Sequence, residues 1–196
     1  MQGSIEKAED YRTVYADHAA TTQMTKKALK AFTDFAKENF GNPSANYATG
    51  LKARGTLNAA RSSVLGAFHL KSGKLIFTGG GSEADNQAIY SAYREGMKQN
   101  KKHMITSAVE HHAVLHTLEK FKEDSFEITV LPVDSFGRID PKALKEAIRP
   151  DTILVSIMYA NNETGTIQPI AAKRTACCFT ATRCRQWGTL ILTFAC

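Results

Sequence analysis

The sequence predicts an α/β fold with three layers, in which helices cover both faces of a mainly parallel sheet. Two observations support this prediction. Short runs of β-branched and apolar residues alternate with helical patterns along most of the chain, and 43% of the 196 residues are hydrophobic while 22% are charged. Strands that alternate with helices imply crossover connections and therefore parallel strands. In such sheets, ligands bind beyond the carboxyl ends of the strands.

The predicted elements follow one another from residue 24 to residue 160. The first helix is amphipathic because Ala28, Phe32 and Phe35 recur at spacings of four and three. The predicted helices cover residues 24–38, 51–68, 82–97, 112–122 and 141–149. The predicted strands cover residues 74–78, 103–107, 126–133 and 152–160.

Composition argues against several classes of function. The net charge is +6, but the basic residues of the first 150 positions are interleaved with acids and form no stripe for nucleic acid. No stretch approaches the ~20 apolar residues of a membrane span. The first ten residues lack the apolar core of a signal peptide. We therefore expect a cytoplasmic protein that binds neither nucleic acid nor membrane.

The end of the sequence differs from the rest. All the cysteines and the only tryptophan lie from residue 177 onward, and the last acidic residue is Glu163. The cysteine spacings match no CxxC pairing that would predict zinc or a disulfide framework. We interpret residues 171–196 as an aberrant tail and residues 1–13 as an N-terminal extension.

The segment after the first predicted strand has the chemistry of a phosphate site. It reads GGGSEADN over residues 79–86. Glycines allow the backbone to approach a ligand closely, and the helix that follows directs N–H groups and its positive dipole end toward an anion. The alternative is an ordinary helix cap, because Ser82 followed by Asp85 resembles a capping box.

The segment after the second strand is rich in histidine. His112 and His116 are four residues apart on one helix face, with Glu110 nearby, so zinc binding is one alternative. No further ligand set is visible, and surface histidines are the other alternative. His111 lies at the junction between strand and helix, where it is better placed to stack on a planar ring or to move a proton.

The last predicted strand ends in YANNETG over residues 159–165. Successive asparagines before Thr-Gly are typical of a turn. Beside the other two strand ends, the same residues offer an amide for contacts to a ring oxygen or a carboxylate.

Taken in order, these three segments resemble the cysteine desulfurases of the class V aminotransferase group. The resemblance also includes YADHAATT at 15–22, GNPS at 41–44, LPVD at 131–134 and RPDT at 149–152. It implies that residues 14–170 form part of the large domain of a transferase that depends on pyridoxal 5'-phosphate (PLP) and acts as a homodimer. It also implies conversion of L-cysteine to L-alanine, with sulfur transfer through an enzyme persulfide, for example to an iron–sulfur scaffold protein.

The resemblance assigns roles to particular residues. Gly81 and Ser82 correspond to residues that hold the cofactor phosphate, with Ser82 in place of the family's usual threonine. His111 corresponds to the catalytic histidine that stacks on the pyridine ring and takes part in proton transfer. Asn162 corresponds to the asparagine near the ring hydroxyl and the substrate. Gln23 stands where proline is common. No metal ligand is implied.

Several residues that the family needs have no counterpart in this sequence. These are the aspartate at the pyridine nitrogen, the Schiff-base lysine, the nucleophilic cysteine and an arginine for the substrate carboxylate. Back-translating the tail from Arg174 to Gly188 and re-reading it one base earlier permits the family's aspartate-bearing strand. We therefore hypothesise a frameshifted tail and expect the chain as written to be an inactive fragment. Two alternatives stay open: a selenocysteine lyase or another class V aminotransferase-like enzyme, and a non-catalytic pseudogene remnant.

Overall fold

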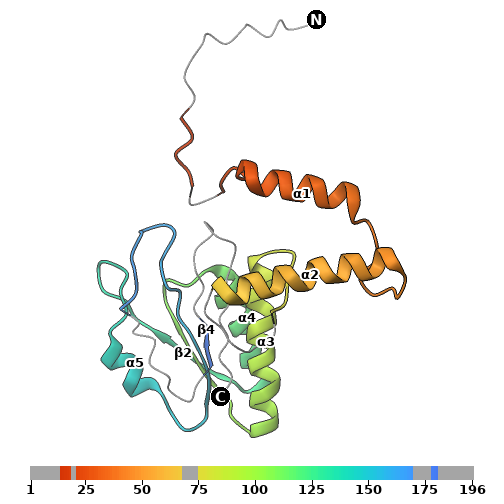
Figure 1. The fold of residues 1–196 in the computed structure, drawn as a ribbon. Helices are drawn as coiled ribbons and strands as arrows, with labels where there is room; N and C mark the ends of the chain where they lie inside the picture. Colours follow the sequence, from red (N-terminus) through yellow and green to blue (C-terminus); the bar gives the residue numbers. More distant parts are fainter. Residues whose placement is uncertain (1–13, 19–20, 68–74, 170–177, 181–196) are drawn as a thin grey trace, which may run out of the picture. The chain divides into compact units, whose positions relative to one another are not determined.

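The computed structural model describes residues 14–18, 21–67, 75–169 and 178–180, which are drawn in colour in Figure 1. The chain divides into two compact units. One unit consists of residues 23–78, and the other contains the rest of the chain. Within the described residues, no helix is long and apolar enough to cross a membrane.

The smaller unit contains two helices, α1 (Lys26–Glu38) and α2 (Ala48–Ala67). The first begins where the Thr25 hydroxyl accepts a hydrogen bond from the Ala28 N–H at 3.2 Å, which satisfies a donor of the first turn. Both helices confirm the sequence prediction to within three residues. The apolar face of α1 remains uncovered in the described structure, where Phe32 is 65% exposed.

The larger unit is built around a four-stranded parallel sheet with the order β2-β1-β3-β4. Its strands are β1 (His103–Ser107), β2 (Glu127–Leu131), β3 (Thr152–Ser156) and β4 (Cys178–Thr180). Its helices are α3 (Gly81–Gln99), α4 (His112–Lys120), the 3-10 helix η1 (Phe121–Asp124) and α5 (Pro141–Ala147). The parallel sheet that the sequence predicts is therefore confirmed.

Helices cover both faces of this sheet, with α3 and α4 on one side and α5 on the other (Figure 1). On the first side, Met104 and Leu154 pack with residues of α3 and α4. On the second side, Ile105 and Val155 pack with Ile139 and with the partly buried apolar residues of α5. Successive strand residues thus face opposite layers, as the pleat of a strand requires. The three predicted layers are confirmed.

Three parts of the predicted secondary structure differ from the observed one. Residues 75–78 form no strand, because none of the described strands pairs with them, and Phe77 is half exposed. The predicted strand 152–160 ends at Ser156, where the ladder with β1 and β4 also ends. A strand also occurs inside the predicted aberrant tail, where β4 extends the sheet beside β3.

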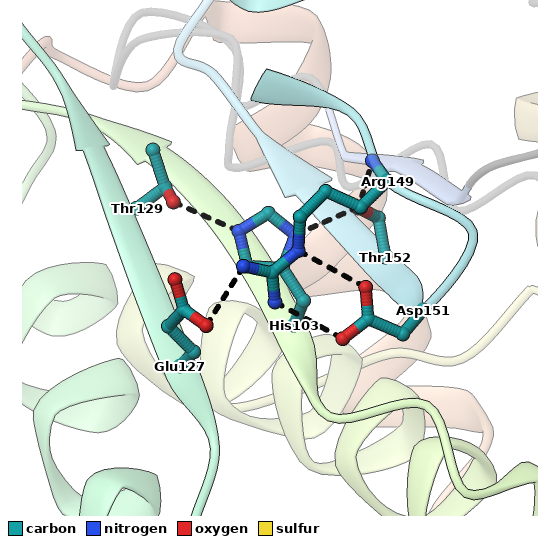
Figure 2. Close-up of polar contacts among 6 residues, drawn as sticks. All are labelled: His103, Glu127, Thr129, Arg149, Asp151 and Thr152. Atoms are coloured by element: carbon teal, nitrogen blue, oxygen red, sulfur yellow. Dashed lines mark hydrogen bonds and ion pairs between the residues drawn. The ribbon is translucent and has the colours of Figure 1, made fainter. Parts of the chain in front are cut away.

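The amino ends of the strands carry a network of polar side chains (Figure 2). His103 is fully buried, and its two ring nitrogens bond the hydroxyls of Thr152 at 2.7 Å and Thr129 at 2.8 Å. Arg149 reaches both Glu127 at 2.7 Å and Asp151 at 3.0 Å. Burial first, and then the charge of Arg149, lower the pKa of His103, so the ring is neutral at pH 7.

Candidate functional site

The order of the strands directs attention to one point of the sheet. From β1 the chain crosses to β2 on one side, and from β2 it returns past β1 to β3 on the other side. In doubly wound sheets, the crevice that binds ligands lies at the carboxyl ends of the two strands where this reversal occurs. Here those strands are β1 and β3. The segments that follow them contain His111 and Asn162.

The amino end of α3 begins in a run of glycines. Gly80 is the N-cap, and no side chain of the described residues caps the helix. Apart from Gly80 and its two neighbours in the chain, no atom of the described residues lies within 4 Å of the position that a Cβ on Gly80 would occupy. Ser82 is exposed and lies inside the first turn, so the alternative of a capping box from Ser82 to Asp85 is wrong. The Glu83 carboxylate instead bonds the loop before the helix, where it accepts a hydrogen bond from the Gly79 N–H at 2.7 Å.

The His111 ring is held by the backbone of the helix that it caps. It is the N-cap of α4, and its Nδ1 accepts a hydrogen bond from the Ala113 N–H at 3.1 Å. Because Nδ1 accepts, the neutral ring carries its proton on Nε2. The half-buried ring therefore has a defined tautomer and position at the strand-to-helix junction.

The two histidines that follow do not assemble a metal site in the described part of the chain. The ring centroids of His112 and His116 lie 5.3 Å apart, and both residues are exposed. No group of three or more His, Cys, Asp or Glu residues suited to a metal ion occurs among the described residues. The described residues therefore offer no third ligand that would complete a zinc site with His112 and His116.

The two asparagines after β3 have different surroundings. The Asn161 Nδ2 donates to the Val109 carbonyl at 3.1 Å, and its Oδ1 accepts from the N–H groups of Glu163 and Thr164 at 2.8 and 3.0 Å. Asn161 therefore holds the loop in place. The Asn162 side chain is half-buried and donates to the Glu163 carboxylate at 2.7 Å. Of the two amides, Asn162 is the less committed to the backbone.

Two of the three segments meet at Glu110, which precedes His111. The Met158 N–H, just after β3, donates to the Glu110 Oε1. The bond from Asn161 to the Val109 carbonyl joins the same two segments. On the other side, the Thr117 hydroxyl of α4 donates to the Asn86 Oδ1 of α3. The structure thus links the segments of Ser82, His111 and Asn162 through neighbouring residues.

Two acids at this junction are buried. Asp85 in α3 is 4% exposed, and Glu110 is 6% exposed. Burial raises the pKa of Asp85 to about 6. Burial also raises the pKa of Glu110 to about 8; the Met158 N–H partly opposes this rise, and the negative charge of Asp85 adds to it. Sequence patterns did not mark this pair, because burial of an acid depends on how the elements pack.

Several buried polar atoms near the carboxyl ends of β1 and β3 lack a hydrogen-bond partner among the described residues. They are the hydroxyl oxygens of Thr106, Ser107 and Ser156, together with one carboxyl oxygen each of Asp85 and Glu110. Buried polar groups are normally paired, so a cluster of unpaired ones indicates a place prepared for a ligand or a proton.

Comparison with known proteins identifies the family. The model of the aminotransferase class-V family matches residues 14–178, so the chain belongs to this family. The chain is 46% identical over 159 residues to a cysteine desulfurase IscS from Methanosarcina thermophila, covering 81% of this chain and 39% of that protein. It is 48% identical over 159 residues to the cysteine desulfurase IscS of Dictyoglomus turgidum, covering 81% of this chain and 40% of that protein.

Solved structures agree with this assignment. A NifS-like protein superimposes with a TM-score of 0.76 at 32% identity, covering 85% of this chain and 48% of that one. SspA in complex with cysteine gives a TM-score of 0.73 at 35% identity, covering 80% and 45%. The resemblance drawn from the motifs is confirmed, and enzymes of this family depend on PLP. The chain spans about 40% of the length of the curated relatives that it matches.

Proposed function

We propose that this chain supplies the phosphate-binding and ring-binding segments of a PLP-dependent cysteine desulfurase. In the proposed reaction, the C–S bond of L-cysteine breaks, the sulfur joins an enzyme cysteine as a persulfide, and L-alanine is released. The observation that carries the proposal is that the segments after β1 and β3 are joined at Val109 and Glu110 at the switch point of the sheet, while α4 is joined to the first turns of α3. The family and the two IscS relatives support the choice of reaction.

The amino end of α3 fits the cofactor phosphate. Gly81 begins α3, where the first N–H groups of a helix have no partner within the helix, and the exposed Ser82 hydroxyl adds a donor beside them. A phosphate at this position also gains from the positive end of the helix dipole. Serine retains the hydroxyl of the family's usual threonine, so the substitution preserves this bond.

His111 and Asn162 fit the ring. When bound, PLP supplies a ring that withdraws electrons from the bonds at the substrate's Cα. His111 would stack on that ring, with its orientation held by the bond from the Ala113 N–H to its Nδ1. Asn162 would donate toward the ring hydroxyl, since its amide makes no bond to the backbone in the described structure. The hydroxyls of Ser107 and Ser156, which have no hydrogen-bond partner within the part of the chain that the structure describes, would offer further polar contacts at the same strand ends.

The proposal extends to partners by analogy with the family. The active protein is a cytoplasmic homodimer that takes L-cysteine and passes sulfur to an acceptor such as an iron–sulfur scaffold protein. SspA, one of the similar structures, was solved with cysteine, which favours an amino-acid substrate of this kind.

Binding of pyridoxamine 5'-phosphate tests the site, because this molecule has the cofactor's ring and phosphate but forms no Schiff base with lysine. We expect Ser82→Ala and His111→Ala each to weaken binding about tenfold in equilibrium dialysis, the loss of one hydrogen bond or stacking contact. Ser91→Ala in the same helix and His116→Ala in α4 are matched controls and should bind normally. Equal effects of the site and control variants would refute the assignment of these residues.

A chimera tests the reaction. Residues 14–170 replace the corresponding segment of the Methanosarcina thermophila desulfurase, and sulfide and alanine are measured after addition of L-cysteine and dithiothreitol. We expect activity that His111→Ala abolishes and His116→Ala retains. A folded chimera without activity would count against the proposal. Preference for L-selenocysteine over L-cysteine would favour the lyase alternative instead.

A further inference from the structure

The side chain of Gln168 is polar and buried, and the function proposed above gives it no role. It closes the loop that carries Asn162 and is 2% exposed. Its Oε1 accepts a hydrogen bond from the Ile139 N–H at 3.0 Å, and its Nε2 donates to the Gly137 carbonyl at 2.7 Å. Both ends of the carboxamide therefore bond the backbone of one turn, which fixes the orientation of the amide.

The loop from Tyr159 to Gln168 is closed at its base, and Asn162 lies in the turn at its far end. The Gln168 N–H donates to the Tyr159 carbonyl at 2.9 Å. Next to this bond, Ala160 forms an antiparallel bridge with Ile167. Because these bonds hold the two sides of the loop together, a movement of its base moves Asn162 as well.

The turn that receives the Gln168 carboxamide is itself well fixed. It covers residues 134–139, and the Asp134 carboxylate accepts hydrogen bonds from two N–H groups of the turn at 2.9 and 2.8 Å. Gly137 has a φ of +76°, a left-handed conformation that favours glycine. Ile139 is buried in the apolar cluster on the α5 side of the sheet. Gln168 therefore ties the loop of Asn162 to a part of the fold that has little freedom to move.

Two further hydrogen bonds attach the same loop to its surroundings. The Thr166 hydroxyl donates to the Phe136 carbonyl of the turn at 2.5 Å. The Asn161 Nδ2 donates to the Val109 carbonyl, in the segment after β1, at 3.1 Å. Thr166 is only partly buried, so water can replace its bond more readily than the bonds of the buried Gln168.

We propose that Gln168, assisted by Thr166, is a positioning residue for Asn162. Its bonds to the turn set the place of the loop, and the loop sets the place of the Asn162 amide relative to the ring hydroxyl of the cofactor. Without the carboxamide, a buried N–H and a buried carbonyl lose their partner, and the loop shifts so that water can reach them. This inference rests on the proposed role of Asn162 in cofactor binding, and Gln168 acts through the loop.

The hold on the loop can be measured without cofactor, by ¹⁵N relaxation of the backbone amides in the purified chain. Gln168→Met keeps the length of the side chain and removes both bonds to the turn. We expect the order parameter of the Asn162 N–H to fall from about 0.85 to below about 0.6. Thr152→Val removes a buried hydroxyl at the amino end of β3 and is the matched control, which should leave that value unchanged. Equal order parameters in Gln168→Met and the unaltered chain would overturn the proposal.

The effect on the cofactor site is measured as discrimination between pyridoxamine 5'-phosphate and its analogue without the ring hydroxyl. We expect the unaltered chain to bind the first about tenfold more tightly, which is the effect of one hydrogen bond. This ratio should fall to about one in Asn162→Ala and to below about three in Gln168→Met, while Thr152→Val keeps it. In the Asn162→Ala background, Gln168→Met should lower the ratio no further. A tenfold ratio in Gln168→Met would contradict the positioning role.

A second variant decides the matter if Gln168→Met yields no folded chain. Thr166→Val removes the bond to the Phe136 carbonyl from a partly buried position and keeps the volume of the side chain. We expect it to lower the ratio of the two affinities from about ten to about four. An unchanged ratio in Thr166→Val would then refute the attachment of the loop to the turn as the device that places Asn162.

The cofactor site and the positioning role fail in different ways. If the unaltered chain does not bind pyridoxamine 5'-phosphate, the proposed cofactor site is wrong, and the relaxation measurement alone decides on Gln168. If the ligand binds without preference for the ring hydroxyl, the role of Asn162 is wrong, and the positioning role of Gln168 is wrong with it. If only Asn162→Ala removes a tenfold preference, the cofactor site stands and the role of Gln168 is wrong.

Discussion

The two ends of the parallel strands differ in how their polar groups are satisfied. At the amino ends, His103 bonds two threonine hydroxyls and Arg149 joins Glu127 to Asp151 (Figure 2). At the carboxyl ends, buried hydroxyls and carboxyl oxygens lack partners among the described residues. The same sheet therefore has one end built for stability and one end that leaves polar groups available. Only the second end coincides with the switch point where α/β sheets bind ligands.

The largest loss of stability should come from a substitution at the amino ends of the strands. His103→Ala removes a fully buried ring and leaves the Thr129 and Thr152 hydroxyls without that partner. We expect a loss of about 3 kcal/mol in the free energy of unfolding, measured in urea at neutral pH. His116→Ala is the control, and its exposed ring should cost less than about 0.5 kcal/mol. Equal losses in the two variants would contradict a special role for the amino-end network.

A smaller effect, on how the free energy of unfolding depends on pH, should come from the acids near the carboxyl ends of the strands. The folded state raises the pKa of Glu110 from 4.5 to about 8, so it binds the proton more tightly than the unfolded chain does. The free energy of unfolding therefore falls as pH rises from about 4.5 to about 8. Glu110→Gln should remove about 2 kcal/mol of this fall between about pH 6 and about pH 8. Urea unfolding at several pH values measures it, and an unchanged slope in Glu110→Gln would contradict the expectation.

The smallest change in the free energy of unfolding is expected for two hydroxyls on one strand, one at each end. Ser156 at the carboxyl end of β3 has a buried hydroxyl that bonds none of the described residues, whereas Thr152 at the amino end bonds His103 and the Arg149 N–H. In the absence of cofactor, Ser156→Ala should raise the free energy of unfolding by about 1 kcal/mol, while Thr152→Val should lower it by about 1 to 2 kcal/mol. Changes of the same sign would remove the contrast between the two ends.

The sequence predicted the layers and the parallel sheet because alternation of apolar runs and helical spacing reflects which faces are buried. It also placed His111 and Asn162 after neighbouring strands, since motif order and strand ends are local features. It missed the end of β3, because Ile157 and Met158 remain buried after the ladder has stopped at Ser156. Burial alone does not separate a strand from the loop that follows it.

The polar core was beyond prediction from the sequence. Asp85 looked like a helix cap and Glu110 like a neighbour of histidines, yet both are buried because α3 packs against α4 and β3. His103 looked like an ordinary strand residue, and its threonine partners come from strands 26 and 49 residues away. No local pattern specifies such long-range pairs. Buried acids and hydroxyls that gather at the ends of strands indicate a functional site, and they become visible only in the folded structure.

The central claim is that the cofactor's ring and phosphate bind at the carboxyl ends of β1 and β3. Backbone amide NMR during titration with pyridoxamine 5'-phosphate tests it most directly. The account predicts shifts at Gly81, Ser82 and His111, with His103 and Thr152 unaffected. Shifts centred on the amino-end network, or no shifts at saturating ligand, would contradict it.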